Sequence, residues 1–135
     1  MSTADTPHSN HKRRTRVKEE RKAQKLGRVR SGWNRISARK TREVVDLIRG
    51  KSVNEAIGIL RVCTRKAALP TLKALKSAMA NATETKKMDL DSLYVKEARV
   101  EEGPTLRRML PRARGRADRI RKRTSHTIIV LAERK

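Results

Sequence analysis

The residues in this sequence best suited to chemistry form a basic block between Gly103 and His126. The block contains nine arginine or lysine residues and one acid, Asp118. An arginine side chain presents a planar fork of donors that matches the oxygens of phosphate groups. Residues of this type at this density predict binding of a polyanion rather than catalysis.

Other constellations of reactive residues are weak. The acids are scattered among basic neighbours, and the histidines His8, His11 and His126 are separated in the chain. A single cysteine, Cys63, allows neither an internal disulfide nor a cysteine-based metal cluster. The run Gly-Lys-Ser at 50–52 lacks the earlier glycine and the preceding strand of a phosphate-binding loop. We therefore expect no enzyme, no metal site and no cofactor.

The chain as a whole is strongly basic. Its 135 residues include 36 basic and 14 acidic side chains, for a net charge of +22. Nucleic acid is the first candidate partner because its phosphates are dense and release counterions when neutralised. An anionic membrane surface is the second candidate. No apolar run is long enough for a membrane span and no secretory signal is visible, so we expect a cytoplasmic protein with no membrane partner.

The aromatic content limits how nucleic acid would be bound. Trp33 and Tyr94 are the only aromatic residues besides the histidines. Because single-strand binders usually stack bases on aromatic side chains, we expect phosphate contacts and shape fit instead. This favours a large folded RNA, although a DNA-compacting protein stays open.

The basic block has two structural interpretations. As a helix it would be amphipathic, with an apolar face made of Leu106, Met109, Leu110, Ala113, Ala117 and Ile120. Pro111 and Gly115 disfavour this helix, by roughly 3 and 1 kcal/mol. As extended chain it would place alternate arginines on one side, in the trios Arg112, Arg114, Arg116 and Arg119, Arg121, Arg123. We favour a projecting two-stranded ribbon, about 30 Å long for about ten residues per strand.

The segments around the block predict a small mixed fold. Residues 1–30 carry ten basic side chains and few apolar ones, so we expect a disordered extension in the free protein, with a candidate polar helix over 15–26. A first helix is expected from the N-cap Ser37 to Gly50. Its apolar stripe consists of Val44, Leu47 and Ile48, with Val45 as a further candidate.

Two further helices and two strands follow. Ser52 and Glu55 form a capping box for the second helix, and the third is expected over 64–82, where Pro70 is awkward. Strands are expected at 93–102 and 126–135, the latter buried on both faces.

The first half of the first helix carries three basic residues, Arg39, Lys40 and Arg42. The helix dipole disfavours cations there. These residues indicate either an external anion or an ordinary solvated face.

Three stretches of the sequence resemble those of a known protein family. They are RISARKTREVVDLIRGKSVNEAIGIL, KSAMANATE and VEEGPTLRRMLPRARGRADRIRKRTSHTIIV. Over residues 34–133 they closely resemble large-subunit ribosomal protein 22 of the bacterial type. The resemblance implies an α+β fold with three helices on a three-stranded antiparallel sheet, whose first strand lies near 34–36. It also implies one domain over 31–135 with a hairpin at about 101–124 and a tip at 106–117. The extension has no counterpart in the common core of the family.

The resemblance further implies a function on the ribosome. The expected partners are 23S rRNA, neighbouring large-subunit proteins and the nascent peptide in the exit tunnel, with macrolide antibiotics nearby. The candidate rRNA-binding residues are Arg35, Arg39, Lys40, Arg42, Arg49, Lys51, Arg99, Arg112, Arg114, Arg116, Arg119, Arg121, Lys122, Arg123 and His126. The candidate tunnel-lining residues are Leu106, Arg107, Arg108, Met109, Pro111, Arg112, Ala113, Arg114 and Gly115.

Overall fold

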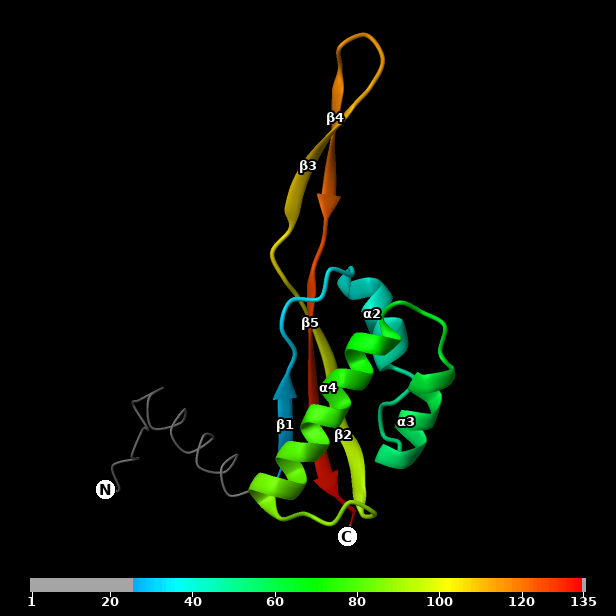
Figure 1. Cartoon of the computed structure of the whole chain (residues 1–135), viewed down its shortest axis with the longest axis vertical. Coiled ribbons are helices and arrows are strands. Elements are labelled where there is room, and N and C mark those ends of the chain that lie inside the picture. Colours follow the sequence, from blue (N-terminus) through cyan, green and yellow to red (C-terminus); the bar gives the residue numbers. More distant parts are fainter. Residues whose placement is uncertain (1–25, 135) are drawn as a thin grey trace, which may run out of the picture.

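The computed structural model describes residues 26–134 and has mixed α+β architecture (Figure 1). The elements in chain order are β1 (Gly27–Arg30), α2 (Ala38–Val45), α3 (Val53–Val62), α4 (Ala68–Ala80), the π-helical turn η1 (Asn81–Thr85), β2 (Leu93–Glu102), β3 (Leu106–Pro111), β4 (Ala117–Lys122) and β5 (Ser125–Glu133). The predicted fold class is confirmed. Residues 1–25 lie outside the described residues. The candidate polar helix over 15–26 therefore falls outside them except for its last residue, and so does the extension before it.

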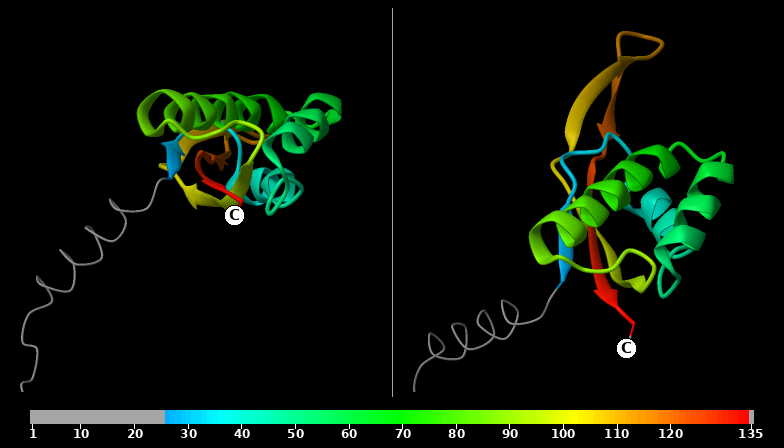
Figure 2. Two further views of the ribbon diagram at one scale, coloured as in Figure 1. Left: turned by 90° about the horizontal axis from the view of Figure 1, so that it is seen from below. Right: turned by 60° about the horizontal axis from the view of Figure 1, so that its bottom comes forward.

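A three-stranded antiparallel sheet forms the centre of the body. Its strand order is β1-β5-β2, and α4 and α2 pack on it from one side (Figures 1 and 2). Strand β5 is buried from Ser125 to Ala132, which confirms the prediction from its continuous apolar run. The main core lies between this sheet and the helices, where Ile129 and Leu131 of β5 meet Leu75 of α4 and Val44 of α2.

The other face of the sheet is covered by charged side chains instead of helices. Ile128 is only 2 % exposed, and its cross-strand neighbours on the same face are Arg30 and Arg99. Arg30 pairs with Glu101 at 3.2 Å, and Arg99 pairs with Glu97 at 3.3 Å. The aliphatic stems of these arginines shield the strand while their heads stay in water.

The helix boundaries follow local hydrogen bonding. The amide of Glu55 donates to the Ser52 hydroxyl at 3.3 Å, which confirms Ser52 as the predicted cap of α3. Helix α2 begins after Ser37 as expected but ends at Val45, because the amides of Leu47 and Ile48 bond three residues back rather than four. Leu47 is consequently 46 % exposed, and the predicted buried stripe is wrong at that position.

Pro70 lies in the first turn of α4, where it costs little. The structure starts this helix at Ala68, four residues later than the sequence predicted. The first amides of a helix have no partner within it, so a proline there removes no hydrogen bond. The predicted kink is therefore not required.

The position of the first strand differs from the expectation. The sequence predicted a strand near 34–36 and assigned 27–30 to the extension, whereas the structure has β1 at Gly27–Arg30. Only Asn34 is extended beside β5, in a single bridge to Ser125. The amide of Ile36 turns back to the Asn34 carbonyl at 2.8 Å, and this tight turn ends the pairing before α2 begins.

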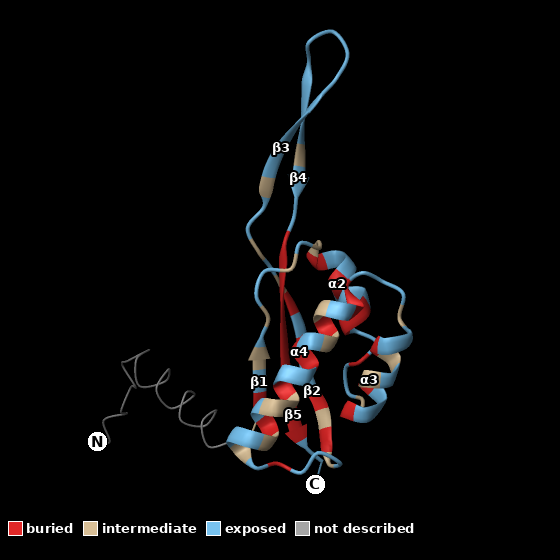
Figure 3. Ribbon diagram, in the orientation of Figure 1, coloured by how far each residue is buried: buried red, intermediate tan, exposed pale blue. Residues whose placement is uncertain are grey.

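Strands β3 and β4 form a separate two-stranded ribbon that projects from the body (Figure 1). We refer to residues 103–124 as the arm. Its side chains are nearly all exposed, and Met109 is 64 % exposed (Figure 3). The extended interpretation of the basic block agrees with this structure, and the amphipathic helix does not. A ribbon without a core is marginally stable in water, so the arm requires a partner that surrounds it.

Candidate nucleic-acid interface

The register of the arm distributes its cations over both faces. Cross-strand partners lie on the same face of a ribbon. Arg107 is opposite Arg121 on one face, and Arg108 is opposite Ile120 on the other. Because both faces are cationic, a flat anionic surface on one side could neutralise only part of the charge. The arrangement fits a polyanion that encloses the arm.

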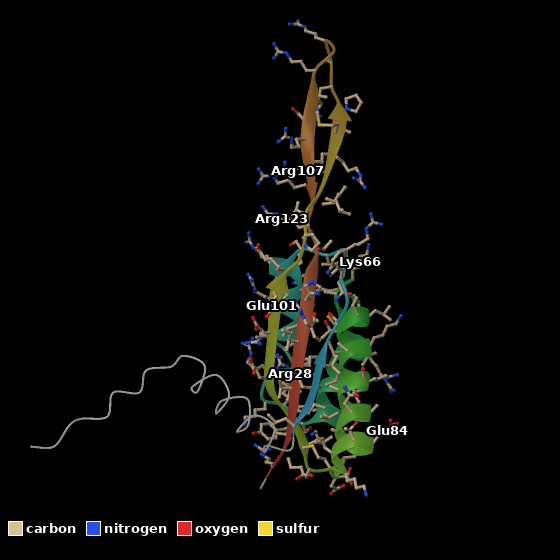
Figure 4. The ribbon with its side chains drawn as sticks, turned by 90° about the vertical axis from the view of Figure 1, so that its left-hand side faces the viewer. Arg28, Lys66, Glu84, Glu101, Arg107 and Arg123 are labelled. Carbon is tan, nitrogen blue, oxygen red and sulfur yellow. The ribbon has the colours of Figure 1, made fainter. Side chains whose placement is uncertain are left out.

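The pair Arg107 and Arg121 places like charges directly across the ribbon. Together with Arg123 they line a hollow of about 330 Å³ near the start of the arm. Arg107 lies farther along the arm than Arg123 (Figure 4). Directly opposed like charges destabilise a ribbon. Glu102 also lines this hollow, so its lining carries three cations and one anion. A phosphate group beside Arg107 and Arg121 would reduce their repulsion, and the excess of positive charge favours binding one.

A larger basic groove lies where the arm leaves the body. It has a volume of about 630 Å³, and it includes Ser37 at the start of α2. Ser37 makes no side-chain cap bond and the first turn of α2 has no acid, so the positive end of the helix faces this groove uncompensated. No acidic side chain of the described residues lines it. Its cations are Arg35, Lys40, Lys66, Arg108, Arg121, Lys122 and Arg123.

The tip of the arm is a short turn rather than the longer segment that was expected. The amide of Arg112 bonds to the Arg116 carbonyl at 2.7 Å, which closes a loop over 112–116. Arg114 and Gly115 both have positive φ, at 57° and 67°. Positive φ at two central residues matches the right-handed twist of the flanking strands. The residues 106–111 and 117, predicted as part of the tip, belong to strands β3 and β4.

The structure divides the sequence-predicted contact residues into distinct groups. Five of them line the groove: Arg35, Lys40, Arg121, Lys122 and Arg123. Arg114, Arg116 and Arg119 are exposed toward the end of the arm, and Arg39 and Arg42 are exposed on α2. Arg112 is at the tip but pairs with Asp118 at 2.9 Å.

Four predicted residues have partners within the body. Arg49 donates two bonds to the Ala98 carbonyl, at 3.2 and 2.7 Å. Lys51 pairs with Glu55, and Arg99 lies in the charged cover of the sheet. His126 is only 9 % exposed, and its Nδ1 is 3.2 Å from the Ser31 carbonyl oxygen. These side chains are less available to an external phosphate than those of the arm.

Lys66 is a groove residue that sequence reasoning missed. It precedes α4 and lies at the level where the arm leaves the body (Figure 4). The sequence did contain a signal for it, because Arg65 and Lys66 form a basic pair at the start of the third expected helix. Arg65, however, pairs with Glu43 of α2. Only the folded chain brings Lys66 beside the arm, and no local pattern contains that information.

Gly103 controls how closely the two strands approach at the start of the arm. Its amide donates to the Thr124 carbonyl at 2.9 Å. A Cβ at this position would lie 2.4 Å from the Thr124 hydroxyl oxygen. Thr124 is 4 % exposed and its hydroxyl donates to the Pro104 carbonyl at 2.7 Å, so it cannot move without breaking that bond.

We expect Gly103→Ala to destabilise the protein by about 1–3 kcal/mol, the usual cost of overpacking. Urea denaturation of the full chain measures this change. The matched control is Gly58→Ala, because Gly58 is exposed in α3 and its added methyl group meets nothing within 4 Å. That control should gain about 0.5–1 kcal/mol. Equal stability of Gly103→Ala and the parent would contradict the close approach.

The described part of the chain offers neither a metal site nor a membrane-spanning helix. Within residues 26–134, no three His, Cys, Asp or Glu side chains gather closely enough to hold a metal ion. The described helices include none that is both long and apolar enough to span a membrane.

The combination of features defines a class of protein: a small α+β structural protein with a long basic β-arm. A profile described as ribosomal protein L22p/L17e matches residues 29–132. The chain therefore belongs to the ribosomal protein L22p/L17e family. Members of this family are structural ribosomal proteins, so the chain is not an enzyme.

Several similar proteins are named large ribosomal subunit protein uL22. The relative from Thermus thermophilus is 58 % identical over 100 residues, 74 % of this chain and 88 % of its own length. One from Desulfitobacterium hafniense is 57 % identical over 101 residues, 75 % of this chain and 89 % of its own. The relative from Deinococcus radiodurans is 47 % identical over 128 residues, 95 % of this chain and 96 % of its own.

The relative from Deinococcus radiodurans also bears on the extension. Its match covers 128 of the 135 residues and so leaves 7 unmatched. Most of the segment before β1 therefore has a counterpart in that protein, although it lies outside the matched family profile, which begins at residue 29. A segment before β1 is thus shared by at least these two proteins.

Proposed function

We propose that this protein binds 23S rRNA in the large ribosomal subunit, holds rRNA segments together during assembly, and lines the nascent-peptide exit tunnel with its arm. The supporting observation is an arm without a core whose two faces both carry arginines. Such an arm is only marginally stable in water and is stabilised by a surrounding polyanion, and folded RNA provides phosphates on all sides. The proposal follows from the family and from the charge of the arm together.

The body and the arm have different parts in this proposal. The groove at the root of the arm binds rRNA phosphates through Arg35, Lys40 and Lys66. The arm extends inward, and its turn at 112–116 faces the tunnel space, close to the nascent peptide and to bound macrolides. The extension adds rRNA or neighbouring-protein contacts at the surface of the subunit. Shape and phosphate contacts, not base reading, provide most of the affinity.

Co-sedimentation with large subunits in high salt tests the proposal. We expect the full chain to stay with the large subunit after a high-salt wash and to protect 23S rRNA from chemical probing. A DNA-architectural protein would instead bind random duplex DNA as tightly as folded rRNA and would not co-sediment. That second pattern would overturn the proposal.

A further inference from the structure

Trp33 is an exposed tryptophan on the loop between β1 and α2. Its side chain is 69 % exposed, and it is the only tryptophan of the chain. A single exposed apolar residue is common on protein surfaces and needs no explanation by itself. The feature that requires an explanation is the rigid loop that presents Trp33.

Both ends of this loop are bonded to β5. The amide of Ser31 donates to the Thr127 carbonyl at 2.8 Å, and the Thr127 amide donates to the Ser31 hydroxyl at 2.8 Å. On the far side of Trp33, Asn34 and Ser125 exchange two backbone bonds, at 2.9 and 3.0 Å. The indole is therefore held outward from a fixed backbone, which is the pre-organisation that a binding residue needs.

His126 fixes the orientation of the indole. The two ring centroids are 6.3 Å apart and the rings meet edge to face at 66°. His126 is itself held by the Ser31 carbonyl and is nearly buried. This packing orients Trp33 but covers a minor part of it, so most of the indole surface stays open. His126 acts here as a positioning residue.

The surroundings of Trp33 select the chemistry of a ligand. Arg35, two residues after Trp33, lines the basic groove at the root of the arm. Gly32 and Asn34, on either side of it, line a second hollow of about 570 Å³ that also includes Arg30 and Lys73. Within the described residues no acid lines either hollow. A ligand that contacts both the exposed indole and these basic hollows combines a flat apolar surface with negative charge, and a nucleobase on its phosphate chain has both properties.

We propose that Trp33 is a stacking platform for an unpaired nucleobase of the RNA whose phosphates occupy the groove at the root of the arm. This inference rests on the proposed rRNA binding. It adds a base contact to an interface otherwise made of phosphate contacts. Stacking of one base on an aromatic side chain corresponds to about 5-fold to about 140-fold in affinity.

The test compares variants of the full chain in binding to a 23S rRNA transcript at fixed salt. We expect Trp33→Ala to weaken binding by about 5-fold to about 140-fold, and Trp33→Tyr to keep most of the affinity. The slope of affinity against salt should be the same in both variants, because no charge is removed. Val62→Ala is the matched control, since Val62 is 83 % exposed at the end of α3, away from both hollows.

Fluorescence provides a direct second readout, because Trp33 is the only indole. Oligoadenylate should quench its emission, and an abasic ribose-phosphate chain of equal length and charge should not. Equal quenching by both probes, or unchanged rRNA affinity in Trp33→Ala, would overturn the stacking site and leave phosphate binding intact. Weaker binding of Trp33→Ala to ribosomal proteins with unchanged rRNA affinity would also overturn it, and would assign Trp33 to a protein neighbour. If the parent chain itself does not bind the transcript, the proposed function fails instead.

Discussion

Exchanging Arg107, Arg121 and Arg123 for glutamine is expected to weaken 23S rRNA binding by about 10²-fold at about 100 mM salt. Removing one phosphate-binding cation lowers the slope of log affinity against log salt by about 0.7–0.9, so removing three lowers it by about 2–3. For the parent chain, with some 6–10 phosphate contacts, affinity should fall by about 10³–10⁵ between about 50 and about 200 mM salt. Filter binding across a salt series measures both quantities.

The same triple variant is expected to lose rRNA affinity but not stability when it is free of RNA. Arg107 and Arg121 are directly opposed on the ribbon, so their removal relieves a repulsion in the protein without RNA. The melting temperature should therefore stay constant or rise slightly while RNA affinity falls. In a misfolded variant both would fall, and circular dichroism separates the two cases.

A matched triple variant tests whether position or net charge determines the affinity. Arg49→Gln, Lys51→Gln and Arg99→Gln remove the same formal charge from side chains that have partners within the body. The ion pairs of Lys51 and Arg99 are exposed and contribute little to stability, and loss of the Arg49 bonds to the Ala98 carbonyl costs about 1–3 kcal/mol, so the fold should persist. We expect a smaller reduction of rRNA affinity than for the arm variant. Equal reductions in the two variants would show that only net charge matters and would contradict the assigned interface.

The elements that the sequence predicted well are those with strong local signals. The Ser52 cap and the continuous apolar run of β5 both appear where the pattern placed them. Pro111 and Gly115 were enough to favour an extended ribbon over a helix whose apolar face was otherwise convincing. In the structure Pro111 ends β3, and Gly115 has the positive φ that the turn requires. Local chemistry decided these features, so one chain was sufficient to find them.

The features that were missed depend on distant pairing. Strand β1 has only four residues, two of them arginines, and its strand character arises from its register with β5 about one hundred residues later. The internal partner of Arg49 is a carbonyl on β2, and no spacing in the sequence connects the two. The basic groove likewise combines α2, the segment before α4 and the arm. The sequence could predict which residues are cationic but not which of them are already paired.

Deleting Leu106–Arg108 is the second change with a large expected effect. It removes half of β3, whose six residues pair with β4. The deletion shortens one side of the arm by about 10 Å. Because three is an odd number, the rest of β3 must also turn its side chains to the opposite face or slip against β4. The helices and the sheet of the body contain none of these residues, so the body should fold with an unchanged melting temperature.

On the ribosome, this deletion should widen the exit tunnel beside the arm and alter the response to macrolides. A cryo-electron microscopy map of ribosomes carrying the variant measures the tunnel. The matched control deletes two cross-strand pairs, Leu106–Arg107 together with Arg121–Lys122. This withdraws the tip by about 7 Å and keeps every remaining side chain on its face, because two is an even number. A tunnel of unaltered width in both sets of ribosomes would mean that the arm does not form its wall.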